Sequence, residues 1–140
     1  MNESKKKKNL DQYCMKAGYD FANEIIKIFN NDATKSDILL TKSLGVLQEQ
    51  GIYAFFLFCK SRPKSESKSG ERIIEIAEKL LKTDLELIRT NKNNNRDILE
   101  AIREDLASSS NLDKLILATQ LLEKALIYAR YHAKARKNTA

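Results

Sequence analysis

The chain has 140 residues, of which 25 are basic and 19 acidic, so its formal net charge is +6 at pH 7. This length suits one domain, and a content of 42% hydrophobic and 31% charged residues excludes a disordered or membrane-embedded chain. Four glycines and one proline exclude collagen-like and turn-dense β architectures, while one histidine and two cysteines leave little material for a zinc site.

The N-terminal part consists of a lysine run followed by a helical pattern. We predict a basic disordered tail over residues 1–9, because the lysines at 5–8 are not followed by the apolar segment of a secretory signal. Over residues 10–29 apolar side chains recur at steps of three and four, which predicts one face of a helix. Gly18 lies inside this helix, where we expect another element to pack closely.

A second helix is expected over residues 34–50, after a polar stretch that ends in a potential N-cap at Asp32. Gly51 follows as a suitable C′ residue in the left-handed conformation. Residues 52–59 are apolar on every side, a pattern that fits a buried strand or a buried helix. Because no second strand-like segment exists to pair with it, we predict a central helix that is buried all round.

The second half begins with the clearest linker of the chain. Residues 61–70 contain the only proline, four serines and a glycine, so we predict a mobile loop. Helical periodicity then predicts helices over residues 71–90 and 96–107, separated by an asparagine-rich break.

The last helix is predicted to begin near Leu112 with Asn111 as its N-cap. Only alanines continue its apolar stripe beyond Tyr131, so we expect its end to project as a basic rod. Together these patterns predict an all-α fold, with residues 10–140 forming a single-domain bundle of about six helices.

The two ends of the chain hold the positive charge. Residues 1–16 contain five lysines and two acidic residues, and residues 124–140 contain five basic residues and no acidic one. The segment between them is nearly neutral. Such asymmetry favours an electrostatic role for the ends, with a polyanion as the expected partner.

The sequence contains few motifs or residue groups that are suited to catalysis. The four glycines are too far apart for a phosphate-binding loop. Asp97, Glu100 and Glu104 share a helix face and suit Mg²⁺ or acid–base chemistry, but the adjacent Arg96 and Arg103 favour a salt-bridged surface instead. We therefore expect no enzyme activity, no metal and no cofactor.

The cysteines and the hydropathy pattern bear on location. Cys14 and Cys59 lie in apolar stretches without metal-ligand spacing, so we expect two buried free thiols and a cytoplasmic protein. The longest apolar run has eight residues, whereas a membrane span needs about 20, so we expect no membrane partner.

The last helix combines basic and aromatic side chains. Arg130, Lys134 and Lys137 fall within about 60° of one another around the helix axis. Tyr128 and Tyr131 flank them, although Tyr128 also suits a core position. Basic groups beside aromatic rings hold phosphates and stack on bases, which is typical of RNA-binding surfaces.

Two segments carry a resemblance to a known family. Residues 42–58 run from a lysine-bearing helix through the turn at Gly51 into a Phe-rich helix, and residues 121–135 run from an aliphatic helix through Arg130 into a small-residue basic tail. In this order they resemble the small all-helical subunit of type III-B CRISPR effector (Cmr) complexes. The family's proline near Leu44 and its tryptophan at the place of Tyr128 are missing, which leaves the small subunit of Csm-type complexes as an alternative.

The resemblance implies a non-catalytic subunit that stacks in several copies beside the guide-bearing filament. Its implied partners are the guide RNA and the target RNA, the large signalling subunit, the backbone subunits and further copies of itself. The residues that we predict to contact RNA are Lys16, Lys42, Lys60, Arg62, Arg130, Lys134 and Lys137.

Three other functions stay open at this point. A helical DNA-binding regulator requires a polar recognition helix after a short turn, whereas the segment after Gly51 is apolar. An enzyme would use the carboxylate face described above. A peripheral membrane protein would use the basic last helix, which loses its large apolar residues where it becomes basic.

Overall fold

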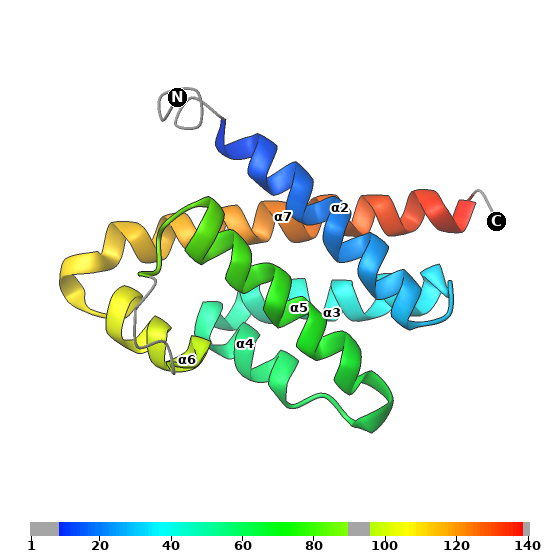
Figure 1. The fold of residues 1–140 in the computed structure, drawn as a ribbon, viewed down its shortest axis with the longest axis horizontal. Coiled ribbons are helices and arrows are strands. Elements are labelled where there is room, and N and C mark those ends of the chain that lie inside the picture. Colours follow the sequence, from blue (N-terminus) through cyan, green and yellow to red (C-terminus); the bar gives the residue numbers. More distant parts are fainter. Residues whose placement is uncertain (1–8, 90–95, 139–140) are drawn as a thin grey trace.

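The structure, a computed structural model, describes residues 9–89 and 96–138. This part of the chain is all-helical, without strands, and packs into one body, which confirms the predicted fold class (Figure 1). The α-helices are α2 (Leu10–Ile28), α3 (Ala33–Gln50), α4 (Ile52–Lys60), α5 (Ser67–Lys79), α6 (Ile98–Ala101) and α7 (Leu112–Asn138). Short 3₁₀ turns are η1 (Lys64–Glu66) and η4 (Ser109–Asn111), and π-helical turns are η2 (Leu80–Asp84) and η3 (Ile102–Leu106).

The long helix α7 is the centre of the bundle, and both α2 and α3 pack along it (Figure 1). The crossing of α2 and α7 is closest at Gly18, where an added Cβ would lie 2.6 Å from Cβ of Tyr128 and 2.9 Å from the carbonyl oxygen of Ala125. The close packing predicted at Gly18 is therefore confirmed. The predicted tail lies outside the described residues except for Asn9, which forms a capping box at the start of α2.

The connection from α3 to α4 agrees with its sequence pattern in most respects. Asp32 caps α3 by accepting a hydrogen bond from the backbone N–H of Lys35, as predicted. Gly51 has the expected positive φ of 95°, but its ψ of 179° is extended, a combination that essentially only glycine adopts. Helix α4 buries Phe55 and Phe56 but leaves Leu57 45% exposed, so the prediction of burial on all sides is wrong. The reason is that α3, α5 and α6 pack around α4 and leave one of its sides open to solvent.

The predicted loop over residues 61–70 is shorter in the structure. It is confined to residues 61–63, because η1 begins at Lys64 and α5 at Ser67. Gly70 lies against the carbonyl oxygen of Cys59 so closely that no Cβ fits there. Gly70 therefore allows the first turn of α5 to lie close to α4, a contact that the serine and proline content of the segment does not indicate.

The two helices predicted after this loop are also shorter. Helix α5 ends at Lys79 and continues as the π-helical turn η2, and the residues up to 89 are not helical. The predicted helix over residues 96–107 begins at Ile98 after the N-cap Asp97 and passes into η3. Asn111 lies in η4, and its side-chain amide donates to the carbonyl of Asp105 instead of capping α7.

The C-terminal end of α7 is packed, so the predicted projecting rod is wrong. Ala133 has no exposed surface, and Lys137 reaches a carboxylate of α3. The alanines that suggested an unsupported helix allow α7 to approach its neighbours closely. Among the described residues, no helix combines the length and the apolar character required to cross a membrane.

Candidate nucleic-acid interface

A buried carboxylate on α3 organises the basic end of α7. Asp37 lies in the inward row of α3 with Leu40 and Leu44, yet it is charged. Nζ of Lys137 lies 3.2 Å from one of its oxygens, and Nε of Arg130 lies 3.7 Å from the other. The hydroxyl of Thr41 also donates to Asp37. Two cations thus share one anion, which leaves a local surplus of positive charge.

Arg130 retains unused hydrogen-bonding capacity. Its Nε is buried, and it makes no hydrogen bond with any other described residue. Its distance of 3.7 Å from Asp37 is too long for a hydrogen bond. The guanidinium group carries five N–H donors in a planar fork that suits phosphate oxygens. Arg130 is therefore held in place by Asp37 without being saturated by it.

A groove runs between α3 and α7 beside this ion pair, and we call it the α3–α7 groove. Its hollow of about 290 Å³ is lined by Leu44, Gln48, Ile127, Arg130, Tyr131 and Lys134. Tyr131 is 68% exposed, and Lys134 is exposed and lines the same hollow. Toward the start of α7 the amide of Gln48 donates to Glu123 across the two helices. The groove therefore offers cations and a free aromatic ring on one wall.

Helix α3 also contains a glycine with no packing role, which is not among the residues that line the groove. Gly45 lies within α3, one turn from both Thr41 and Gln48, and a Cβ added to it would meet no atom within 4 Å. In a helix interior glycine is less favourable than alanine by about 1 kcal/mol. Gly18 and Gly70, by contrast, are each required by a close neighbour.

The structure brings some of the predicted RNA-contacting residues together. Arg130 and Lys134 line the groove, Lys137 lies at Asp37, and Lys42 is exposed on the adjoining face of α3. The exposed side chain of Ile38 lies one turn before Lys42. The RNA contacts of these residues stay predictions, but the positions of the residues are compatible with one surface.

The other three predicted residues lie away from the groove. Lys16 pairs with Asp20 on α2 at 2.8 Å, and Lys60 lies 3.7 Å from Asp97. Arg62 lies 3.5 Å above the ring of Phe58 and donates to the carbonyl of that residue. Its side chain is thus engaged in packing α4 against the start of α5.

Tyr128, which the sequence left between core and surface, faces α2. Its hydroxyl donates to Asp11, and that hydrogen bond raises the pKa of Tyr128 above its ordinary value. Lys124 also bonds to Asp11 at 2.8 Å, and together these two contacts lower the pKa of the Asp11 carboxyl. Tyr131 is therefore the free aromatic ring of this helix end, while Tyr128 joins α7 to α2. His132 is exposed and meets Tyr19 edge to face.

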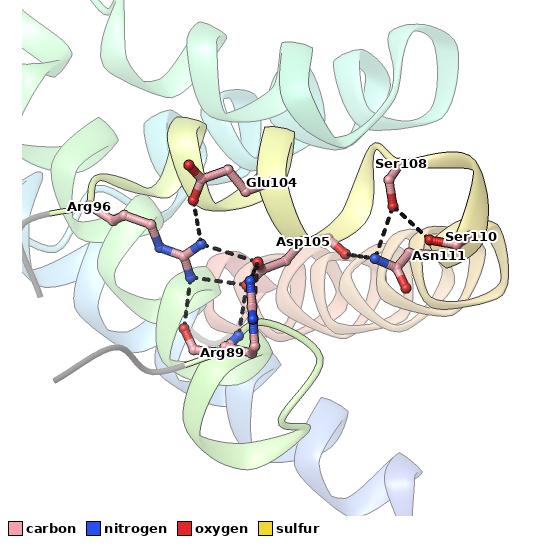
Figure 2. Close-up of polar contacts among 7 residues, drawn as sticks. All are labelled: Arg89, Arg96, Glu104, Asp105, Ser108, Ser110 and Asn111. Atoms are coloured by element: carbon pink, nitrogen blue, oxygen red, sulfur yellow. Dashed lines mark hydrogen bonds and ion pairs between the residues drawn. The ribbon is translucent and has the colours of Figure 1, made fainter. Parts of the chain in front are cut away.

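The acidic face of η3 forms ion pairs with Arg96, as predicted (Figure 2), whereas Arg103 donates a hydrogen bond to the hydroxyl of Tyr53. Arg96 bonds to both Glu104 and Asp105, and Arg89 adds its guanidinium and its backbone N–H to Asp105. These hydrogen bonds, those of Arg96 above all, hold the pKa of Asp105 far below its usual range. Within residues 9–89 and 96–138 no group of three acidic, histidine or cysteine side chains is arranged to hold a metal ion.

Both thiols are buried and free, which confirms that prediction. Burial raises the pKa of Cys14 to about 11 and that of Cys59 to about 12. The thiolate is the reactive form, so neither side chain is poised for nucleophilic chemistry.

Sequence reasoning missed one residue of the candidate interface, Asp37. The signal for Asp37 was its place in an inward row that is otherwise aliphatic, since a buried charge requires a partner. Comparisons with protein-family models, curated proteins and solved structures found no match for this chain.

Proposed function

We propose that this chain is an RNA-binding, non-catalytic subunit whose α3–α7 groove contacts single-stranded RNA. The observation that carries the proposal is the exposed ring of Tyr131 beside Lys134 and the partly exposed side chain of Arg130, all three lining one groove. Cations supply the sequence-independent attraction to phosphates, and an exposed aromatic ring supplies a stacking platform for a base. The three side chains extend from two successive turns of one helix, so one short stretch of RNA can contact all of them.

The sequence resemblance gives this activity a setting. We propose that the chain is the small subunit of a type III-B CRISPR effector complex and that several copies lie along the guide–target RNA. The large signalling subunit and the backbone subunits are its expected partners. The small subunit of a Csm-type complex is the alternative within the same class, and the groove serves RNA equally in both.

A DNA-binding regulator is less well supported. The helix that follows the turn at Gly51 is α4, which buries Phe55 and Phe56. A recognition helix needs polar side chains free to enter the major groove. The α3–α7 groove also lies between two helices that pack along each other, and neither helix protrudes as a recognition helix would.

The proposal is tested by the pair Tyr131→Ala and Lys134→Glu in one variant. We expect its affinity for labelled single-stranded RNA to fall about 30-fold, because a stacking contact and a phosphate contact are both lost. The matched control is Tyr19→Ala with Lys27→Glu, which removes an exposed tyrosine and reverses an exposed lysine on α2. Equal losses in both variants, or a wild-type affinity that does not depend on salt, would contradict the proposal.

The assembly is tested separately by co-expression. The full chain should co-purify with the large and backbone subunits of a type III-B system and protect the bound target RNA from nuclease. Co-purification only with the corresponding Csm-type subunits would favour the alternative, and co-purification with neither would reject this setting.

A further inference from the structure

A further hollow lies where α3 ends, beyond the hydrogen bond from Gln48 to Glu123. Helix α3 ends at Gln50, whereas α7 extends back to Leu112, so the first turns of α7 do not have α3 beside them. The turn between α3 and α4, the π-helical turn η3 and helix α7 line this hollow. Its volume of about 470 Å³ lies within the range of about 300–1,000 Å³ that is typical of small-molecule sites.

The walls of this hollow are largely aliphatic. Ile52, Ile102 and Leu115 line it from α4, η3 and α7. Thr119 lines it as well, but its hydroxyl already donates to the carbonyl of Leu115 and needs no partner from a ligand. A Cβ added to Gly51 would meet no atom within 4 Å, so the hollow is open at this turn. An apolar molecule that enters would displace water from apolar side chains, which favours binding.

The cation at this hollow retains most of its hydrogen-bonding capacity. Arg103 is exposed, and its guanidinium group donates to the hydroxyl of Tyr53 at 2.7 Å. Among the described residues no carboxylate forms an ion pair with it, and Asp97 and Glu100 act on it only at longer range. A guanidinium group has five N–H donors, so most of those of Arg103 are available to a ligand.

Helix α4 adds to the positive field of Arg103. It begins at the same hollow, and its N-cap Gly51 has no side chain that could bond to the first N–H groups of the helix. The N-terminal end of a helix carries a partial positive charge. A ligand of this hollow therefore meets aliphatic walls together with one full positive charge and one partial positive charge.

We infer that this hollow binds a small aliphatic carboxylate, with its alkyl chain against Ile52, Ile102 and Leu115 and its carboxylate on Arg103. The inference goes beyond the proposed function, because none of these four residues lines the α3–α7 groove. A carboxylate forms two parallel hydrogen bonds with one guanidinium group and matches its single charge. A phosphate ester would bring up to two negative charges to a largely apolar site with one cation, and a basic ligand would be repelled.

The test uses octanoate as the probe and octanol as its neutral counterpart, in calorimetric titrations of the full chain without RNA. Octanoate should bind about 10-fold more tightly than octanol, because the carboxylate bonds to Arg103. Arg103→Gln should weaken octanoate binding about 10-fold and leave octanol binding within about 2-fold of wild type. Ala107→Phe, at an exposed position that lines the hollow, should weaken the binding of both ligands by filling the space.

Two control variants separate recognition of the carboxylate from effects on structure and net charge. Lys114→Gln removes an exposed cation of α7 that does not line the hollow, and it should leave both affinities unchanged. Tyr53→Phe removes the hydrogen bond from Arg103 but keeps the cation and the ring. In this variant octanoate should still bind more tightly than octanol.

Equal affinities of the wild type for octanoate and octanol, or no binding of octanoate, would overturn the inference. Equal losses of octanoate affinity in Lys114→Gln and Arg103→Gln would reduce the effect to net charge and reject the site as well. A dimer in sedimentation that Ala107→Phe abolishes, in a chain that binds no octanoate, would assign the hollow to contacts between copies instead. Each of these results leaves the proposed RNA-binding function standing, because the measurements contain no RNA.

Discussion

Two buried aspartates, each facing two cations, behave differently in this molecule. Asp105 accepts hydrogen bonds of 2.9 Å from Arg96, from the guanidinium of Arg89 and from the Arg89 backbone (Figure 2). Asp37 accepts one of 3.2 Å from Lys137, while Arg130 stays at 3.7 Å. The first carboxylate is saturated by its partners, and the second is not.

This difference separates a structural centre from a binding surface. At Asp105 the charges balance once Glu104 is included, and the bonds join η3 to Arg96, which precedes α6, and to Arg89, which follows η2. At Asp37 the cations outnumber the anion and retain free donors. A buried ion pair stabilises when its geometry satisfies both partners, whereas an unsatisfied cation remains available to a ligand.

The largest expected effect is the loss of stability on removing the saturated carboxylate. Asp105→Ala should lower the free energy of unfolding by about 3 kcal/mol, because it leaves the largely buried Arg96 without its main partner. Urea unfolding followed by circular dichroism measures this loss. The control is Glu104→Gln, at a half-exposed position, where we expect less than about 0.5 kcal/mol. Equal losses in the two variants would remove the distinction between the centres.

The next effect concerns acid. Asp105 has a folded-state pKa below its ordinary value, which is about 3.9 in an unfolded chain. Its contribution is therefore fully present above that ordinary value and is lost as the pH falls toward the folded-state pKa. We expect about 2 kcal/mol less stability at pH values near 2 than at neutral pH from this group alone. Asp105→Asn should remove this component, and an identical pH profile in the variant would refute it.

A smaller effect is expected at Asp37, with the opposite consequence for binding. Asp37→Asn should cost about 1 kcal/mol of stability, because its hydrogen bonds are few and long. It should raise the affinity for single-stranded RNA about 3-fold and steepen the log–log salt slope by about 0.7, since one competing anion is gone. Fluorescence anisotropy across a salt series measures both. The control is Asp105→Asn at matched temperature, which should leave the salt slope of RNA binding unchanged. A steeper slope in this variant would contradict the distinction between Asp37 and Asp105.

The smallest effect is expected at Arg89. Its side chain is 79% exposed, so Arg89→Ala should cost only about 0.5 kcal/mol, with the backbone N–H still bonded to Asp105. The same unfolding measurement checks it. A loss as large as that of Asp105→Ala would show that the exposed arginine, and not Arg96, holds the centre together.

Local sequence patterns predicted the helices well where interactions within one helix set its bounds. The steps of three and four over residues 10–29 predicted α2, and Asp32 and Gly51 marked the bounds of α3. Prediction failed where a neighbour decided the outcome. The first turn of α5 packs against α4 at Gly70, inside the segment predicted as a loop, and Ala133 is buried near the end of α7, which was predicted to project.

The prediction of the candidate interface also agreed with the structure within one helix and failed where the tertiary structure decided the outcome. The clustering of Arg130, Lys134 and Lys137 followed from their spacing on one helix. Lys16, Lys60 and Arg62 were equally basic in sequence, but each has another partner in the fold and lies away from the groove. The spacing of residues along the sequence does not predict which acidic side chain will pair with a basic side chain that is distant in the sequence.

The amino-acid sequence alone determined the helical class, the order of the helices and the concentration of positive charge at the end of α7, because periodicity and composition act within one helix. The tertiary structure decided that α3 lies beside that end, that Asp37 holds two cations without satisfying them, and that Gly45 has no neighbour. These are relations between residues about 100 positions apart, such as Asp37 and Lys137, and packing of the whole chain sets them.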